Sequence, residues 1–488
     1  MAKTTFIKFG TSGYRGIINQ SFSNIEIHAI GLAIATLLHK KYTQPHIAIA
    51  YDPREGNCPH LQASSFTYIL TQTLINAGIS ITFFTDYAPT PFLSWYVPAH
   101  SLQGGIILTA SHNPPEYNGL KFNPKNGAPA DPSTTQEIEC NLAQKNLQTH
   151  TKKGTLYNTT PNWKIFSETI KENLIKIGLQ IPKNINLHIA VDCKHGTSAK
   201  LWEAVKETFH IDTLTLLHKE PKSDFNHLDT NPCNTEALTQ LKSIIQTNNI
   251  PLGIANDPDA DRHIILDEKG TPLTPEETGL IILDFFLSVN INCHALISTL
   301  ASSRILKTAA QQNNLNYHEC NIGFKYIAQH LERYKQKKEI AFGIESSGGF
   351  SSSFHTLEKC GFLPGILLSL ALHHSKKPLS KHKEDIQKKY GFFHFKESSF
   401  TFKKETKTQL QKQLHLQTKE TLQMHYNELI QTLNTDDGLK INFNQTSWAL
   451  LRFSGTEPVL RIYTESTNNL HSQTLNHKTH TLIDTLLT

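Results

Sequence analysis

The sequence predicts an α/β fold, with three tandem α/β domains containing mixed sheets and then a C-terminal α+β domain. Strand-like and helix-like apolar patterns alternate through most of the 488 residues. The alternation restarts near residue 187 and again after Gly270. The last hundred residues differ, since a Lys-, Gln- and Thr-rich stretch with helical segments over 381–435 leads into short alternating strands. This change of pattern predicts that the chain ends in a domain of another plan.

The first domain is expected over residues 1–150. A Ser/Asn start and helical periodicity predict a helix over Ser23–Leu38, and apolar runs predict strands at His46–Ala50, which ends at Asp52-Pro53-Arg54, and at Ile79–Phe84. A helix is expected over 61–76 and a buried strand over Gly105–Thr109. The polar stretch over 145–162 is expected to be a linker between domains.

The second and third domains are expected over residues 151–262 and 263–385, and the fourth over 386–488. In the second, strands are predicted at Leu187–Val191 and Leu252–Ala255 and a helix over 235–247. In the third, Thr274-Pro275-Glu276-Glu277 predicts a capping box that opens a helix ending near Val289. The remaining predicted strands are His294–Ser298, Tyr317–Cys320, Ile340–Ile344, 438–443, 447–451 and 459–463, with a closing helix over 470–487.

The composition indicates a packed globular protein, because 38% of residues are hydrophobic and 18% are charged. The formal net charge of +5 is small for this length. The sequence has no basic cluster interleaved with aromatic residues, so it does not indicate a nucleic-acid partner. Seven scattered cysteines without a Cys-x-x-Cys pair argue against a disulfide framework and a zinc site. No window holds the ~18 apolar residues of a membrane span, and the start lacks the apolar core of a signal peptide. A cytoplasmic location is therefore expected, with neither a nucleic acid nor a membrane as partner.

The segment Thr109–Phe122 places a hydroxyl, an imidazole and an ammonium group around a Gly/Pro-rich turn. Ser111 lies just past the carboxyl end of a predicted strand, where open α/β sheets bind ligands. With His112 and Lys121 close in sequence, Ser111 is a candidate to carry a covalent intermediate. The alternative is a polar turn in which Asn and Pro serve only as turn formers.

Three carboxylates at alternate positions, Asp257, Asp259 and Asp261, follow another predicted strand. Oxygen ligands of this kind suit Mg²⁺ or Ca²⁺. A calcium-binding helix-loop-helix is excluded, because position six of the loop is Arg262 rather than glycine and the flanks are predicted strands. A bound cation explains the clustered charge better than the alternative of a plain Asp-rich turn, because unpaired carboxylates repel one another.

The segment Arg452–Pro458 combines a guanidinium, two hydroxyls and a glycine between two predicted strands, with Arg461 shortly after. Glycine lets backbone N–H groups approach an anion, and arginine binds phosphate through two parallel hydrogen bonds. The candidate phosphate-binding residues are Arg452, Ser454, Gly455, Thr456 and Arg461. The alternative, a hairpin turn, explains the glycine but not the clustering of the other side chains.

Three further segments carry weaker signals. Gly343–Gly349 places Glu345 and Ser347 at a spacing that suits the vicinal hydroxyls of a sugar. Gly10–Gly16 could bring Arg15 to an anion. Gly323-Phe324-Lys325 could open a helix with a cation near its start. Each is also compatible with an ordinary glycine-containing turn.

Taken together and in this order, these segments closely resemble the α-D-phosphohexomutase superfamily, which includes phosphoglucomutase, phosphomannomutase and phosphoglucosamine mutase. The resemblance extends over essentially the whole chain and is carried by Phe9–Gly16, Thr109–Phe122, Asp257–Arg262, Glu345–Gly348 and Arg452–Pro458. It implies four domains around a central cleft, each contributing one loop. It also implies that Ser111 is a phosphoserine whose phosphate completes a Mg²⁺ site with the three aspartates.

The resemblance implies roles for the other candidate residues as well. His112, Lys121 and Arg15 surround the transferring phosphoryl group, and Arg262 faces the cleft. Glu345 and Ser347 hold sugar hydroxyls, while Lys325 is a candidate acid/base or sugar contact. The substrate's non-reacting phosphate is held by Arg452, Ser454, Gly455 and Thr456, with Arg461 as a further substrate-binding residue.

The activity implied is the interconversion of a hexose 1-phosphate and a hexose 6-phosphate through glucose 1,6-bisphosphate or its equivalent. Glucose is the leading substrate and mannose the second. The glucose or mannose branch is favoured because Ser12 stands where glucosamine mutases commonly carry Asp, and because Pro115–Gly119 and Gly323-Phe324-Lys325 resemble that branch. Phosphoglucosamine mutase and a phosphoserine-dependent sugar phosphatase are the alternatives. Two positions depart from the family pattern: Ser346 stands where Glu, Gln or Met is frequent, and Ala260 where Gly is frequent. The expected partner is a small sugar phosphate, and the expected state is a monomer or homodimer.

Overall fold

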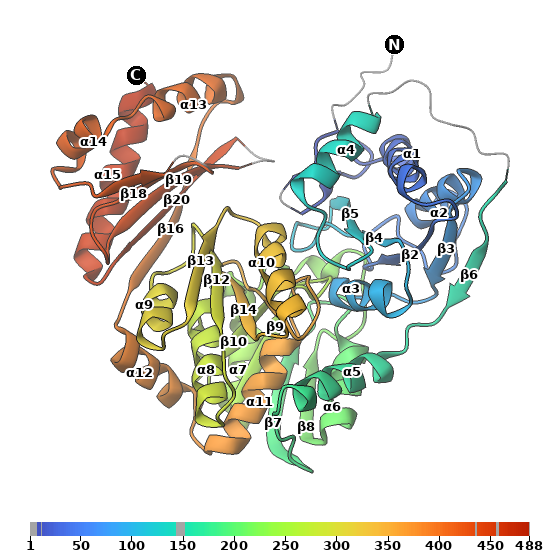
Figure 1. Cartoon of the computed structure of the whole chain (residues 1–488), viewed down its shortest axis with the longest axis horizontal. Coiled ribbons are helices and arrows are strands. Elements are labelled where there is room, and N and C mark those ends of the chain that lie inside the picture. The colour runs from blue at the N-terminus through green and yellow to red at the C-terminus, as the bar shows by residue number, and fades with distance from the viewer. Residues whose placement is uncertain (1–6, 11, 143–151, 435–436, 455–457, 488) are drawn as a thin grey trace. The chain divides into compact units, whose positions relative to one another are not determined.

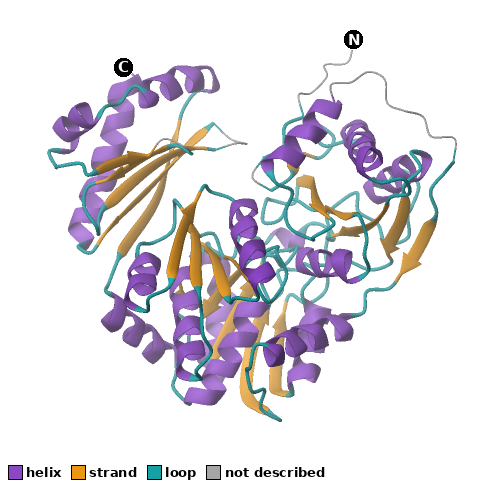
Figure 2. Ribbon diagram, in the orientation of Figure 1, coloured by secondary structure: helices purple, strands orange, loops and turns teal. Residues whose placement is uncertain are grey.

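The computed structural model describes residues 7–10, 12–142, 152–434, 437–454 and 458–487. The chain divides into two compact units (Figure 1). Unit 1 comprises residues 1–294 and 324–383, and unit 2 comprises residues 295–323 and 384–488. Figure 2 shows that both contain sheets flanked by helices. None of the described helices is long and apolar enough to cross a membrane.

The first sheet of unit 1 is mixed and has the strand order β1-β5-β4-β2-β3-β6. Its strands are β1 (Tyr14–Ile17), β2 (His46–Tyr51), β3 (Ser80–Phe84), β4 (Gly104–Leu108), β5 (Tyr117–Pro124) and β6 (Leu156–Thr159). β2 runs parallel to β3 and β4, whereas β5 runs antiparallel to β4 and β1. The parallel strands therefore end at one edge, where their loops meet.

Four helices flank this sheet: α1 (Asn24–Lys41), α2 (Phe66–Asn76), α3 (Thr90–Ala99) and α4 (Pro132–Leu142). Alternate residues of β2, including Ile47 and Ile49, join the apolar core formed with Ile30 of α1 and Leu70 of α2. α3 packs against β2 and β4. All residues of the strand after His46 are thus buried, which is why 47–51 is an unbroken apolar run.

The second sheet of unit 1 has the order β11-β10-β9-β7-β8. Its strands are β7 (Ile185–Asp192), β8 (Ile211–Leu217), β9 (Leu252–Asn256), β10 (His263–Leu266) and β11 (Pro272–Leu273). Around it lie α5 (Trp163–Lys176), α6 (Ala199–Phe209), α7 (Thr239–Asn248) and the short 3₁₀ helices η1 (Phe225–His227) and η2 (Thr235–Leu238). β9 and β10 are antiparallel neighbours joined by residues 257–262. The acidic segment is therefore a tight hairpin loop.

This pairing bears on the domain boundary expected at residue 262. β10 and β11 follow that residue and pair in the same sheet as β9. We propose that the boundary between the second and third domains lies after Leu273 instead. The boundary expected at residue 150 falls outside the described residues.

The rest of unit 1 comprises α8 (Pro275–Ser288), α10 (Phe324–Lys337), α11 (Leu363–Ser375) and the antiparallel pair β14 (Ala341–Glu345) and β15 (Gly349–Ser352). The predicted capping box of α8 is confirmed. Thr274 Oγ1 accepts a hydrogen bond from the Glu277 amide at 3.1 Å, and the Glu277 carboxylate accepts one from the Thr274 amide at 3.0 Å. α8 and α10 both pack against β14, which ends at Glu345.

Unit 2 contains the parallel strands β12 (Ala295–Thr299) and β13 (Asn316–Cys320), the helix α9 (Ile305–Gln312) and an antiparallel sheet of order β16-β20-β19-β18-β17. The sheet's strands are β16 (His394–Thr401), β17 (Thr432–Asn434), β18 (Leu439–Asn442), β19 (Trp448–Phe453) and β20 (Val459–Ser466). Its helices are η3 (Lys404–Thr406), α13 (Lys407–His415), α14 (Lys419–Tyr426) and α15 (Asn469–Leu487), while α12 (Leu379–Tyr390) crosses the division between the units. Leu451, Ile462 and Ile483 lie in the core between this sheet and α15.

The predicted fold class, α/β with a C-terminal α+β domain, is confirmed, but three elements differ from their predictions. The expected linker over 145–162 contains β6, which pairs with β3, and the expected helical stretch contains β16, which pairs with β20. Both are edge strands with many exposed side chains, so they lack an apolar pattern. α2 begins at Phe66 rather than residue 61, because Leu61 and Ser64 have positive φ and Ser65 caps the helix.

Candidate functional site

Ser111 lies three residues past the end of β4, as its sequence position predicts. The residue is buried and has a φ of +55°, a left-handed conformation that is costly for a residue with a side chain. Its amide donates a hydrogen bond to Thr109 Oγ1 at 2.8 Å, and its hydroxyl donates one to Asp257 Oδ2 at 2.7 Å. The loop after β4 thus presents the serine oxygen to the acidic hairpin after β9.

The three aspartates of that hairpin converge. Carboxylate oxygens of Asp257, Asp259 and Asp261 all lie within 4.8 Å of one another, and all three side chains are buried. Burial, together with the two other carboxylates, raises the pKa of Asp257 to about 8. The pKa of Asp261 is lowered despite burial, because Lys121, Lys359 and Arg262 favour its charged form. Ala260 between them has a φ of +51°, a conformation that glycine adopts without strain.

Two buried lysines neutralise the aspartates. Lys121 Nζ lies 2.5 Å from Asp259 Oδ2 and 2.7 Å from Asp261 Oδ2, and Lys359 Nζ lies 3.2 Å from Asp261 Oδ2. Burial alone lowers the pKa of Lys121, but the two aspartates more than offset it, so the pKa is raised. Both ammonium groups are therefore charged at neutral pH.

The donor set fits a hard divalent cation. Asp259 Oδ1 and Asp261 Oδ1 are buried and have no hydrogen-bond partner among the described residues. Such orphaned oxygens are costly unless a ligand satisfies them. Three carboxylates with a serine oxygen beside them are the oxygen ligands that Mg²⁺ takes, with other positions left for phosphate oxygen or water.

His112 follows Ser111 in its loop, and Arg15 reaches the same loop from β1. His112 Nδ1 is 3.4 Å from Ser111 Oγ, and Arg15 Nη1 donates a hydrogen bond to Asn113 Oδ1 at 2.6 Å. Burial, and then the guanidinium groups of Arg262 and Arg15, place the pKa of His112 well below its usual value of 6.5. The imidazole is therefore neutral at pH 7.

The segment Glu345–Gly349 adjoins the acidic hairpin. Arg262 pairs with Gly349 as an isolated antiparallel bridge, and its Nη1 donates a hydrogen bond to Ser347 O at 3.4 Å. Glu345 is buried at the end of β14 and stabilises the charged forms of Arg262 and Lys359. The structure thus brings the predicted sugar-binding segment to the aspartates.

Lys325 lies in the first turn of α10, with Nζ 5.5 Å from the centre of the Tyr326 ring. Its predicted role as an acid/base or sugar contact stays a prediction.

The predicted phosphate-binding residues belong to unit 2. Arg452 is the last residue but one of β19, and its Nε donates to Asp437 Oδ1 at 3.0 Å. Arg461 on β20 lies directly opposite Arg452 in the sheet. Arg461 Nη1 is 3.1 Å from Glu397 Oε1, and Ser454 O accepts a hydrogen bond from Lys407 Nζ at 3.2 Å. Gly455 and Thr456 lie outside the described residues.

Three residues at the site have no counterpart in the sequence-based prediction. They are Thr90, whose hydroxyl donates to Asp259 Oδ2 at 2.5 Å, Lys359, and Arg54, whose guanidinium contacts the Ser111 loop. Arg54 and Thr90 follow β2 and β3, so their position after a parallel strand was the available signal. The sequence around Lys359 gave no such signal, because this lysine reaches Asp261 from a loop 98 residues further along the chain.

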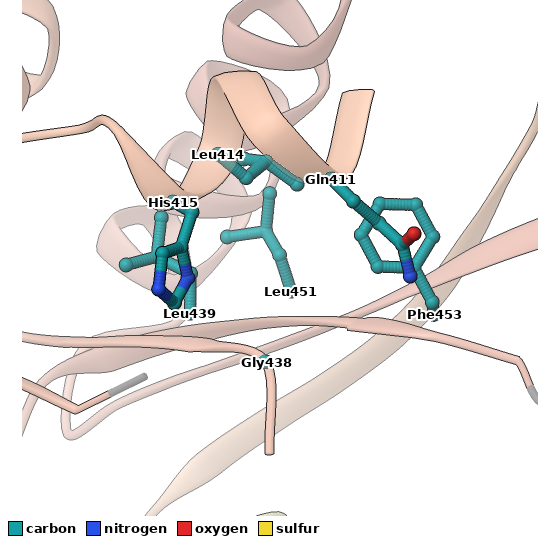
Figure 3. A pocket seen from close by; sticks show the side chains of 7 residues that line it. All are labelled: Gln411, Leu414, His415, Gly438, Leu439, Leu451 and Phe453. Atoms are coloured by element: carbon teal, nitrogen blue, oxygen red, sulfur yellow. The ribbon is translucent and has the colours of Figure 1, made fainter. Parts of the chain in front are cut away.

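A separate cavity of about 190 Å³ lies within unit 2 between α13 and the strands of the antiparallel sheet (Figure 3). Leu414, Gln411 and His415 reach into it from the helix, and Leu439, Leu451 and Phe453 from the strands. None of the predicted site residues lines it, and its lining is largely apolar.

Family models identify the class of protein to which this fold and site belong. The phosphoglucomutase/phosphomannomutase alpha/beta/alpha domains I, II and III match residues 7–149, 164–270 and 274–390, and the C-terminal domain matches residues 404–476. The chain belongs to the phosphoglucomutase/phosphomannomutase family, whose members are isomerising phosphotransferases. The membership of the α-D-phosphohexomutase superfamily predicted from the sequence is confirmed.

Individual relatives are distant. The phosphoglucomutase/phosphomannomutase of Thermococcus kodakarensis is 25% identical over 468 residues, 94% of each chain. The phosphoglucomutase of Staphylococcus aureus strain MRSA252 is 27% identical over 363 residues, which cover 71% of this chain and 64% of that relative, less than two thirds of its length. A phosphoglucomutase/phosphomannomutase family protein from Burkholderia thailandensis has a similar solved structure, with a TM-score of 0.78 at 17% identity, covering 99% of this chain and 97% of the other.

Proposed function

We propose that this chain interconverts hexose 1-phosphate and hexose 6-phosphate, with glucose as the leading sugar and mannose as the second. The observation that carries the proposal is the 2.7 Å hydrogen bond from the Ser111 hydroxyl to Asp257, inside a cluster of three aspartates and two lysines. A hydroxyl held there can carry a phosphoryl group whose charge is balanced by the surrounding cations.

The reaction proposed has two phosphoryl transfers. In the first, the bond from phosphorus to Ser111 Oγ breaks, a bond to the free sugar hydroxyl forms, and the hydroxyl proton passes to a base, giving a hexose 1,6-bisphosphate. Ser111 Oγ takes up a proton as it leaves. In the second transfer, the bond from the other phosphorus to its sugar oxygen breaks, a bond to Ser111 Oγ forms, and the sugar oxygen takes up a proton as Ser111 Oγ loses its own. The neutral imidazole of His112 is one candidate for the base, since its Nδ1 lies 3.4 Å from Ser111 Oγ.

The residues proposed to hold Mg²⁺ are Asp257, Asp259 and Asp261, with the Ser111 phosphate as the fourth. When bound, Mg²⁺ withdraws charge from the transferring group. Lys121 and Arg15 hold positive charge at the same place and so stabilise the developing charge of the phosphoryl group. Positioning and electrostatics supply most of the catalysis in such reactions.

The remaining predicted residues are proposed to bind the substrate. Glu345 accepts from, and Ser347 donates to, sugar hydroxyls, while Lys325 and Arg262 contact the substrate from nearby segments. The phosphate that does not react is held by Arg452, Ser454, Gly455, Thr456 and Arg461. The predicted cytoplasmic location and monomeric or homodimeric state belong to the same proposal.

The first experiment compares glucose, mannose and glucosamine 1-phosphates as substrates, with Mg²⁺ and a catalytic amount of the matching 1,6-bisphosphate. Conversion of the glucose compound, with the mannose compound second, is the expected result. Preference for glucosamine 1-phosphate would favour a phosphoglucosamine mutase. Release of inorganic phosphate as fast as isomerisation would favour a phosphoserine-dependent sugar phosphatase.

The Ser111→Ala variant tests the covalent mechanism. Removal of the nucleophilic oxygen is expected to lower kcat by at least ~1000-fold, because no other group can take its place. The matched control is Ser369→Ala on α11, since that buried hydroxyl donates only to its own helix at Gly365 O. Undiminished turnover of Ser111→Ala, beside an active control, would rule out the phosphoserine mechanism.

A further inference from the structure

All five N–H groups of the Arg54 guanidinium donate hydrogen bonds to the Ser111 loop or to Asp52 beside it. The side chain is fully buried three residues past the end of β2, and its five N–H groups are the most that any side chain can donate. Four of them reach backbone carbonyls of the Ser111 loop: Ser111 O at 2.6 Å, Asn113 O at 2.7 Å, and Pro114 O and Tyr117 O at 2.8 Å. The fifth, on Nε, pairs with Asp52 Oδ2 at 3.1 Å.

Asp52 extends the same network to the other side of Ser111. Asp52 Oδ2 also accepts a hydrogen bond from Thr109 Oγ1 at 2.6 Å, and Thr109 Oγ1 accepts one from the Ser111 amide at 2.8 Å. The carbonyl of Ser111 is therefore held directly by Arg54, and its amide is held through Thr109 and Asp52. Both peptide groups that define the backbone of Ser111 are fixed by one buried ion pair.

A strained segment of the second domain covers Arg54. The Arg54 guanidinium carbon lies 4.8 Å from the centre of the Phe225 ring, which is fully buried. Phe225, Asn226 and His227 have successive φ values of +50°, +53° and +58°. Three consecutive left-handed residues with side chains are costly and persist only where the surroundings hold them. Thr230, three residues after His227, donates a hydrogen bond from its hydroxyl to His112 O at 2.7 Å, so this segment also contacts the Ser111 loop.

We infer that Arg54, held beneath Phe225, is a positioning residue that fixes Ser111 in its left-handed conformation and so aims the serine oxygen at the acidic hairpin. The inference rests on the proposed function for its catalytic consequence, but the geometry that it explains is independent of the substrate. A φ of +55° at a serine needs compensation from outside the loop, and four hydrogen bonds from one rigid group supply it.

The chain contains a matched control for a buried cation at this kind of position. Lys194 follows β7 as Arg54 follows β2, in the similar segment Asp192-Cys193-Lys194, and it is equally buried. Among the described residues, its ammonium contacts Asp192 Oδ2 at 3.0 Å and the carbonyl of Ala237, both within the second domain. Loss of Lys194 should therefore cost stability without releasing Ser111.

The experiment uses the full chain with Arg54→Lys, Phe225→Leu and Lys194→Met. Lysine keeps the charge of Arg54, but its compact ammonium cannot span four carbonyls. For Arg54→Lys we expect kcat to fall ~100-fold, since a displacement of about 1 Å can cost that much, with KM within threefold of the wild-type value. Amide hydrogen exchange of peptides spanning 109–119 should become faster. Phe225→Leu should show a smaller fall in kcat and a smaller increase in exchange rate. Lys194→Met should lower the Tm but change neither kcat nor the exchange of these peptides.

A rescue experiment separates positioning from a general loss of folding. Millimolar guanidinium chloride should restore part of the kcat of Arg54→Ala, whereas methylammonium chloride, which carries the charge without the planar donors, should not. Failure of guanidinium to exceed methylammonium would overturn the inference. So would an Arg54→Lys kcat within threefold of the wild type, or a loss confined to KM.

The two proposals fail in different ways. If the wild-type protein turns over no hexose phosphate, the proposed function fails, and hydrogen exchange alone decides the role of Arg54. Faster exchange over 109–119 in Arg54→Lys, but not in Lys194→Met, then supports the inference. Unchanged exchange overturns it.

Discussion

At the residue scale, the acidic hairpin is balanced by side chains that reach it from other segments. Asp257, Asp259 and Asp261 lie beside the ammonium groups of Lys121 and Lys359. Lys121 Nζ touches two of the three carboxylates, so it occupies part of the space that attracts a metal ion. A lysine in this place repels a divalent cation while it stabilises a transferring phosphoryl group.

Lys121→Met therefore has opposite expected effects on metal binding and on turnover. Removal of the positive charge should tighten Mg²⁺ or Mn²⁺ binding several-fold, because the cation no longer competes with an ammonium group for Asp259 and Asp261. Turnover should fall by ~100-fold or more, since the phosphoryl group loses a charged partner. Titration calorimetry with the metal and a coupled mutase assay measure the two effects.

The Lys164→Met variant on α5, whose lysine side chain is 71% exposed, is the control and should change neither quantity. Weaker metal binding in Lys121→Met would contradict this account of the site, because it would mean that Lys121 organises the aspartates rather than opposing the metal.

The sequence could reveal the site residues that lie close together along the chain. Asp257, Asp259 and Asp261 share one hairpin, and Ser111 with Lys121 share one loop and the strand after it. Thr90 and Lys359 could not be found in this way, because they meet the aspartates only after the chain has folded over 169 and 98 residues. For Thr90 the only signal is its position after a parallel strand, and no local pattern distinguishes Lys359 from an ordinary loop lysine.

At the element scale, the buried strands were predictable and the edge strands were not. β4, β9 and β14 are buried along their length, and so is β2 after its first residue. Their sequences are apolar except at strand ends, where His46, Asn256 and Glu345 stand. β6 and β16 pair through their backbones while their side chains are partly or fully exposed. Pairing at an edge requires backbone groups only, which leaves no hydrophobic period to detect.

The ends of β7 and β8 are joined by a charged pair whose contribution depends on pH. His218 Nδ1 lies 2.7 Å from Asp192 Oδ1, and this hydrogen bond raises the pKa of His218 above its usual 6.5. A raised pKa in the folded state means that the protonated imidazole stabilises the fold. This stabilisation is complete below pH 6.5 and is lost as the pH rises through the folded-state pKa of His218.

His218→Gln removes this dependence, because glutamine keeps a donor but carries no proton that titrates. The Tm of the wild type should exceed that of the variant by more at pH 5.5 than at pH 9, as measured by calorimetry. The His60→Gln variant, at an exposed histidine, serves as the control. Its Tm should differ from that of the wild type by the same amount at pH 5.5 and at pH 9. A wild-type advantage that grows toward pH 9 would contradict the assigned role of the Asp192–His218 pair.

At the scale of the whole molecule, the proposed reaction depends on groups from both compact units. The aspartates, lysines and Ser111 all belong to unit 1, whereas Arg452 and Arg461 belong to unit 2. These two arginines are direct cross-strand neighbours in β19 and β20, and like charges placed in this way repel each other. Asp437 and Glu397 each partner one of them in the structure. Chemistry and phosphate recognition are thus proposed to be separable by mutation.

Arg452→Met is expected to weaken sugar phosphate binding and to leave metal binding unchanged. The loss of charged hydrogen bonds to phosphate, worth about 1.5–3 kcal/mol, corresponds to a ~10–100-fold rise in Kd. Calorimetry in a Ser111→Ala background prevents turnover and allows glucose 6-phosphate and Mg²⁺ to be titrated separately. The exposed Lys419→Met on α14 is the charge-matched control in the same unit and should bind both as the parent does. An unchanged Kd for the sugar phosphate would remove Arg452 from the proposed phosphate site. An equal loss of Mg²⁺ affinity would contradict the proposal that unit 1 residues bind the metal and unit 2 residues bind the phosphate.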